Sequence, residues 1–125
     1  MSGTITSRSP LFWLLQRVTG AFLAVFLFTH VKVLHWDFDF TTQGLIDFSF
    51  VIGRLQGSVG WAVFYFLFIL SALFHGLNGL WAVILDFRPS GTAQKVWLAA
   101  LWVAGILTAY YGLKTLGAFY RGGAA

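Results

Sequence analysis

Long apolar stretches dominate the sequence, and two short polar connections separate them. The apolar stretches run from about residue 10 to 36, from 58 to 86 and from 93 to 120. An α-helix crosses the ~30 Å hydrocarbon core of a bilayer in about 20 residues, so each stretch is long enough to span it. Ser9 and Pro10 suit an N-cap and a first helical residue at the start of the first stretch. The pattern predicts an all-α membrane protein with three transmembrane helices in a single domain, residues 1–125.

The two connections differ in character. The first, roughly residues 37–57, alternates aromatic and acidic residues, which favours a short amphipathic piece lying along the membrane surface. The second is compact: Pro89 and Gly91 end one helix, and Gln94 and Lys95 open the next.

Composition agrees with a lipid environment. Of the 125 residues 58% are hydrophobic and 10% are charged, whereas a soluble domain of this size needs about a quarter charged residues. The net charge of +4 is scattered without a basic run, so nucleic acid is not an expected partner. The sequence has no cysteine, which excludes disulfides, zinc fingers and iron–sulfur ligation by this chain. Any iron–sulfur centre that it works with must belong to another subunit.

The N-terminal segment is not a good signal peptide, because Gln16 and Arg17 interrupt its apolar run. We expect it to remain as a span of a multi-pass protein in the inner or cytoplasmic membrane. The basic residues divide evenly between the two sides, so the positive-inside rule gives no orientation by count. The aspartates of the first connection favour a cytoplasmic N-terminus.

The second apolar stretch places His75 and Asp86 about three helical turns apart, on one stripe of a helix. Asp86 suits the interface, so His75, about 16 Å away along the axis, lies near the middle of the bilayer. An ionisable side chain at that depth usually has a function. One imidazole nitrogen can bind a metal while the other donates to Ser71, one turn upstream, or to a backbone carbonyl. Gly76 and Gly79 remove side-chain bulk beside it, which would let a flat macrocycle approach.

A simpler interpretation of His75 stays open. A lone histidine flanked by glycines can hydrogen-bond a neighbouring membrane helix, and small residues four apart promote close helix packing. The residues alone therefore leave haem ligation and helix packing as alternatives.

The segment HGLNGLWAVILDF, residues 75–87, resembles the second-helix motif of the small cytochrome b anchor subunits of succinate dehydrogenase. In that motif a His is followed by Gly four positions on, by an aromatic residue or Arg six positions on, and by Asp-Tyr after eleven and twelve. Gly79, Trp81 and Asp86 fit the motif, and Phe87 departs from it. Residues 13–20, WLLQRVTG, are similar to the first-helix signature of the same subunits, in which Ser or Thr follows Arg by two positions.

The resemblance implies that His75 is an axial ligand of haem b and that a sister anchor subunit supplies the second ligand. The three helices would then form half of a haem-binding helical bundle. It places Asp86 and Trp81 at the quinone pocket, where the missing phenol at Phe87 leaves the quinone to other groups or another subunit. Arg17 would serve a haem propionate or the quinone pocket, with an ordinary interfacial anchor as the alternative.

Two further histidines need an interpretation. Some relatives of this family carry two haems, and His30, about 20 Å along the first helix from Arg17, has a suitable depth for a second haem ligand. Alternatively His30 packs against a neighbour and binds nothing. His35 sits beside Trp36 and Asp37 and is interpreted as an interfacial residue.

The sequence thus predicts the membrane-anchor and cytochrome b subunit of a succinate:quinone oxidoreductase (complex II) or fumarate reductase. A flavoprotein subunit would oxidise succinate and an iron–sulfur subunit would pass the electrons to quinone. This chain would hold one haem b, or two, and help to form the quinone site, with no catalytic residue and no activity alone. The alternatives are a haem-free structural anchor of the same type of complex, and a small transporter or proton-relay subunit using the stripe of His75 and Asp86.

Overall fold

The structure, a computed structural model, describes residues 9–32 and 48–122. These residues form four helices: α1 (Pro10–Val31), α2 (Phe48–Leu55), α3 (Val59–Asp86) and α4 (Gly91–Tyr120). The helices α1, α3 and α4 are each long and apolar enough to cross a membrane, and no strand occurs in the described ranges. The prediction of an all-α membrane protein with three transmembrane helices is confirmed.

A serine begins each of the three long helices. The hydroxyls of Ser9, Ser58 and Ser90 accept hydrogen bonds from first-turn backbone N–H groups at 3.2, 3.4 and 3.3 Å, respectively. These bonds satisfy donors that have no partner inside the helix, which matters most where the chain enters a medium poor in water.

The α3–α4 connection is a tight turn at residues 87–90. Arg88 has a φ of 50°, in the left-handed region that non-glycine residues rarely adopt. Pro89 follows it and cannot continue the helix, so α3 ends at Asp86. The next helix begins at Gly91, two residues earlier than the sequence predicts.

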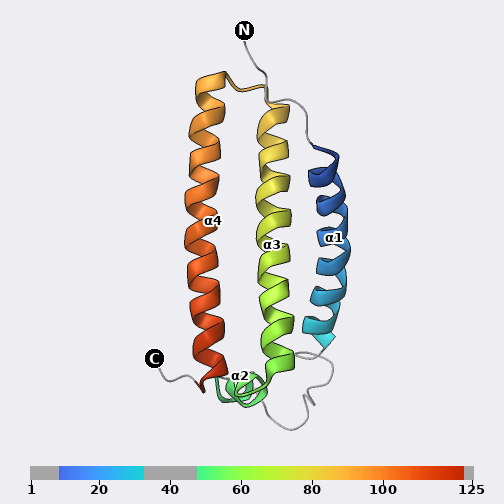
Figure 1. The fold of residues 1–125 in the computed structure, drawn as a ribbon, viewed down its shortest axis with the longest axis vertical. Helices are drawn as coiled ribbons and strands as arrows, with labels where there is room; N and C mark the ends of the chain where they lie inside the picture. Colours follow the sequence, from blue (N-terminus) through green and yellow to red (C-terminus); the bar gives the residue numbers. More distant parts are fainter. Residues whose placement is uncertain (1–8, 33–47, 123–125) are drawn as a thin grey trace.

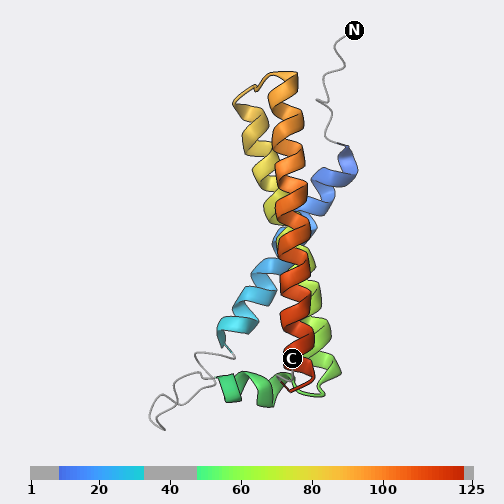
Figure 2. The same cartoon turned by 90° about the vertical axis from the view of Figure 1, so that its left-hand side faces the viewer.

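The three long helices lie in a single row with α3 in the middle (Figure 1). Both α1 and α4 pack on α3, whereas no contact joins α1 to α4 in the part of the chain that the structure describes. The helix α4 runs beside α3 along its length, and α1 crosses α3 obliquely (Figure 2). Leu55 is the single apolar residue that is buried among the described residues. The chain therefore forms a layer one helix thick, with broad apolar faces turned outwards.

The short helix α2 lies across the end of the row where α3 begins and α4 ends (Figure 2). It contacts both of these helices, and the Gly57 N–H that follows it donates to the Tyr120 carbonyl at 3.1 Å. The helix α2 lies within the first connection, residues 37–57, in which the sequence predicts an amphipathic piece. The rest of that connection, and the predicted end of the first helix with His35, lie outside the described residues.

Candidate functional site

His75 lies near the middle of α3 and turns its ring towards α1. Its Nδ1 is 3.2 Å from the backbone carbonyl oxygen of Gln16 and 3.4 Å from Oγ1 of Thr19. Of the two partners that the sequence suggests for this nitrogen, the structure provides a backbone carbonyl, and it comes from the neighbouring helix. Ser71 is buried one turn upstream but is not among the hydrogen-bond partners of His75 in the described part of the chain.

The side-chain amide of Gln16 joins α1 to α3 at the same level. Its Nε2 donates to the His75 carbonyl oxygen at 3.1 Å, and its Oε1 accepts from Nδ2 of Asn78 at 2.7 Å. A Cβ atom on Gly79 would lie 3.2 Å from Nε2 of Gln16. Gly79 therefore makes room for this amide, whereas the sequence assigns its open space to a macrocycle.

Gly76 has a different environment. It is exposed, and a Cβ atom there would meet no neighbouring atom within 4 Å. The open side of α3 next to His75 is therefore at Gly76, and the side at Gly79 is filled by α1.

The residues predicted for a quinone pocket lie towards the opposite end of the row from α2. Asp86 is the exposed last residue of α3, Phe87 beyond it is 82% exposed, and Trp81 is half-buried. Arg17 is exposed, with its guanidinium 5.1 Å from the centre of the Trp13 ring.

The structure does not bring Arg17 and Asp86 together. Gln16, the neighbour of Arg17, contacts Asn78, and Asp86 lies about 12 Å further along α3. A molecule that touches both residues must span that distance.

His30 is near the other end of α1, on the same α1–α3 interface. Its Nδ1 lies 3.1 Å from the Tyr65 hydroxyl oxygen, and its ring stacks on Phe68 at 6.1 Å between centroids. Both His30 and Tyr65 border a cavity of about 660 Å³ between α1, α2, α3 and α4, which Thr108 and Thr115 also line. The structure thus separates the two histidines into different sites.

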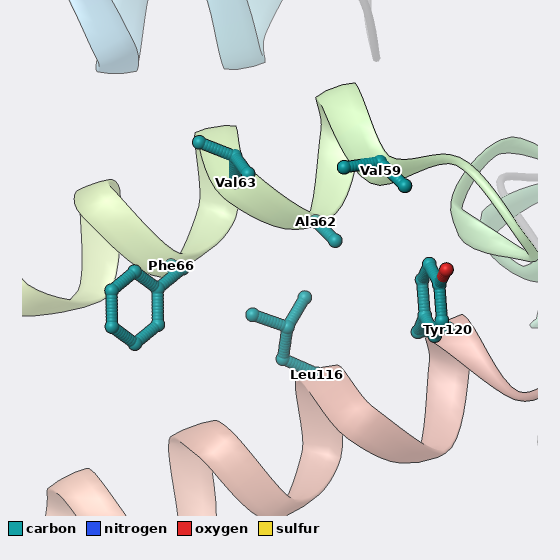
Figure 3. Close-up of a pocket in the computed structure, with 6 residues that line it drawn as sticks. All are labelled: Val59, Ala62, Val63, Phe66, Leu116 and Tyr120. Carbon is teal, nitrogen blue, oxygen red and sulfur yellow. The ribbon is translucent and has the colours of Figure 1, made fainter.

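A second hollow, of about 300 Å³, lies between the start of α3 and the end of α4 (Figure 3). Its lining is apolar apart from the Tyr120 hydroxyl, the single oxygen among the side chains drawn there. One hydroxyl among apolar side chains is too little to orient a ligand.

Comparison with known proteins identifies the family. The model of the succinate dehydrogenase/fumarate reductase transmembrane subunit family matches residues 7–110. The chain belongs to this family.

Its relatives agree with this assignment. The chain is 36% identical to a succinate dehydrogenase hydrophobic membrane anchor subunit from Thermoplasma acidophilum, over 78% of this chain and 76% of the relative. It is 32% identical to a protein of the same name from Archaeoglobus fulgidus, over 86% and 87% of the two chains. It is 30% identical to the succinate dehydrogenase cytochrome b558 subunit of Bacillus subtilis, over 86% of this chain but 54% of the relative. No solved structure matches the chain.

This family member is accordingly a multi-pass membrane anchor of the succinate dehydrogenase type, and it associates with the membrane and with catalytic subunits. The suspected family from the sequence motifs is confirmed.

The contacts of α1 with His75 were not predicted from the sequence, although Gln16 and Thr19 belong to the first-helix motif. Gln16, Thr19 and Gly20 occupy one face of α1 at helical spacing and all meet His75. Asn78 follows His75 by one turn and contacts Gln16. The sequence does indicate this contact. Gln16 and Asn78 lie in two apolar helices, and an amide side chain in lipid is energetically unfavourable unless it forms a hydrogen bond.

Metal coordination by protein side chains alone finds no support in residues 9–32 and 48–122. The described ranges contain no group of three or more His, Cys, Asp or Glu side chains that could hold an ion. A haem needs only one axial nitrogen from a given chain, because the porphyrin supplies the other four.

Proposed function

We propose that this anchor subunit is a cytochrome b, that it ligates haem b through Nε2 of His75, and that it helps to form the quinone site of a succinate:quinone oxidoreductase. The observation that carries the proposal is that the two nitrogens of the His75 ring have different surroundings. Its Nδ1 is engaged by α1, and no hydrogen-bond partner for Nε2 occurs among the described residues. Ligating histidines commonly have this arrangement, with one nitrogen on the metal and the other on a carbonyl.

The surroundings of His75 fit a flat macrocycle. The imidazole sits near the middle of a 28-residue membrane-spanning helix, and the open position at Gly76 lies directly beside it. Bound haem b supplies a reversible one-electron store. The chain itself holds the imidazole, excludes water with its apolar helices and so contributes to the redox potential.

The Bacillus relative supports both the haem and a second anchor chain. Its name is that of a cytochrome b558 subunit, and this chain spans about half of its length. We infer that a sister anchor subunit takes the place of the other half and supplies the second axial ligand. A flavoprotein subunit and an iron–sulfur subunit complete the assembly, since this chain has no cysteine for a cluster.

We place the quinone site at the end of the row that contains Asp86, Trp81 and Arg17, with the N-terminus on the cytoplasmic side. Quinone reduction takes two electrons, delivered singly by the iron–sulfur subunit, and two protons. An exposed carboxylate at the end of α3 can pass protons from water, and the Arg17 guanidinium can donate to a quinone oxygen or a propionate. Phe87 cannot donate a hydrogen bond, so it contributes only apolar contact.

His30 is our candidate ligand for a second haem. Its Nδ1 is held by the Tyr65 hydroxyl much as that of His75 is held by α1. The haem-free anchor remains the competing hypothesis for the whole chain, with both histidines serving only to join α1 to α3.

The haem-to-flavin ratio of the purified complex tests the proposal. We expect a reduced bis-histidine b-type spectrum in the wild-type complex and loss of a haem component in His75→Ala. Loss of a further haem component in His30→Ala would show that a second haem is bound there, and His35→Ala serves as the matched control. Full haem content in His75→Ala defeats the assignment, and a wild-type complex without haem establishes the structural anchor.

A further inference from the structure

His75 faces two hydrogen-bond acceptors on α1. One is the Gln16 carbonyl oxygen at 3.2 Å from Nδ1, and a carbonyl can only accept. The other is Oγ1 of Thr19 at 3.4 Å, whose single proton is directed at carbonyls of its own helix, that of Leu15 at 2.7 Å and that of Gln16 at 3.3 Å. Nδ1 must therefore carry the ring proton of the neutral imidazole. The lone pair that can bind a metal then belongs to Nε2.

Gly20 allows the ring to come so close to the α1 backbone. A Cβ atom at this position would lie 3.2 Å from Cε1 and 3.5 Å from Nδ1 of His75. An alanine methyl group would therefore press on the ring edge that bears the Nδ1–H group. Gly20 and the Gln16 carbonyl together define where the imidazole plane can lie.

The Gln16 side chain holds the two helices in the matching register. Its amide bonds to the His75 carbonyl and to the Asn78 side chain, at 3.1 and 2.7 Å. Interhelical hydrogen bonds of this kind help to hold membrane helices together. Because they fasten α3 at His75 itself, sliding of α1 would break them and also remove the carbonyl from Nδ1.

We propose that Gln16, Thr19 and Gly20 are positioning residues for haem ligation. They hold His75 as the Nδ1–H tautomer, present Nε2 to the iron and thereby set the haem potential. This inference rests on the proposed ligation by His75. A hydrogen bond from Nδ1–H to an acceptor makes Nε2 a more basic ligand, which favours ferric iron. Loss of an acceptor should therefore raise the midpoint potential.

Thr19→Val gives the sharpest test, because it removes one of the two acceptors of Nδ1, leaves the Gln16 carbonyl in place and keeps the shape of the side chain. In the intact complex we expect haem to remain bound, its midpoint potential to rise and the EPR g values of the ferric form to shift. A tenfold weaker preference for ferric iron corresponds to a rise of about 59 mV in a one-electron couple. Thr19→Ser keeps the hydroxyl and should restore the wild-type values. Thr108→Val on α4, where the hydroxyl donates to the Ala104 carbonyl, is the matched control for the haem component assigned to His75.

Gly20→Ala and Gln16→Leu test the other two members. We expect about 10- to 100-fold weaker haem retention in each, as is typical when the support of a metal ligand is removed. Gly112→Ala is the control for the glycine, since a methyl group there meets only Ile69 carbon atoms at 3.5 Å or more. Gln94→Leu, whose amide bonds the Pro89 carbonyl at 3.0 Å, is the control for the glutamine.

The outcomes separate this inference from the proposed function. Absence of haem from the wild-type complex, or full haem in His75→Ala, contradicts ligation itself. Haem that depends on His75 but keeps its potential and EPR signature in Thr19→Val contradicts the positioning role alone. The comparison of Thr19→Val with Thr19→Ser decides the matter even if Gly20→Ala fails to assemble.

Discussion

Nδ1 of His30 and the hydroxyl oxygen of Tyr65 lie 3.1 Å apart across the α1–α3 interface. The contact is the reverse of the one at His75, where the imidazole comes from α3 and its partners from α1. Along α1 the two sites are separated by about 16 Å, the rise between Thr19 and His30. The α1–α3 interface therefore contains two hydrogen-bonded imidazoles at two different depths.

Tyr65→Phe removes the partner of His30 and keeps the ring. We expect the haem component assigned to His75 to retain its potential, because the two sites share no hydrogen bond in the described residues. A second haem component, if His30 binds one, should shift in potential for the reason given for Thr19→Val. A redox titration of the purified complex checks both. A shift confined to the His75 component would contradict this assignment of partners.

Ser71→Ala should leave the haem spectrum and potential unchanged. Ser71 is buried one turn from His75, but Nδ1 already has its partners on α1. We expect an effect on stability below about 1 kcal/mol, since the serine hydroxyl bonds to neither histidine in the described structure. The measurement is the potential and the haem content beside those of Thr19→Val. Equal shifts in the two variants would show that Ser71 takes part in holding the ring.

Arg17→Gln should weaken quinone reduction while succinate oxidation with a soluble dye stays normal. Loss of a charge-assisted hydrogen bond costs about 1.5–3 kcal/mol, which corresponds to a roughly ten- to hundredfold higher KM for quinone. Arg121→Gln, at the far end of α4, is the matched control. An unchanged KM in Arg17→Gln would favour the simple interfacial anchor, consistent with its stacking on Trp13.

The absence of cysteine from the sequence makes the membrane orientation directly measurable. Thr92→Cys lies in the first turn of α4 and Arg121→Cys just beyond its end, and both positions are exposed. With a cytoplasmic N-terminus, a membrane-impermeant thiol reagent added outside intact cells should label residue 121 and spare residue 92. The reverse labelling pattern would invert the orientation, and with it the side on which the catalytic subunits bind.

Much of the fold follows from the length of the apolar stretches and from single residues at their ends. Ser9 with Pro10 predicts the start of α1, and Asp86 is the observed end of α3. The turn is less predictable: α4 begins at Gly91 because Ser90 caps it, whereas Gln94 and Lys95 suggest a later start. Capping by a small hydroxyl outweighs the position of the first polar residues in the helix.

The position of His75 along its helix was predictable from the sequence, but much of its surroundings was not. The sequence offers Ser71 or a backbone carbonyl as the partner of His75, and the structure provides a carbonyl, which comes from α1. The sequence also leaves Gly79 open to a macrocycle, whereas the structure fills that space with Gln16. A helix that is apolar all round has no hydrophobic stripe to mark its partner face, because lipid is as apolar as another helix. The face must be found from polar and small residues on two helices at once.

The row of helices also governs how a cofactor could enter. A closed bundle must part its helices before a bulky planar molecule can reach its axis. Among the described residues the other two long helices lie on two flanks of α3, so under the proposed ligation a porphyrin would reach His75 sideways from the lipid without separating α1 from α3. In the proposed assembly with a sister anchor subunit, haem binding would precede docking of that subunit, which would then enclose the haem between the two chains.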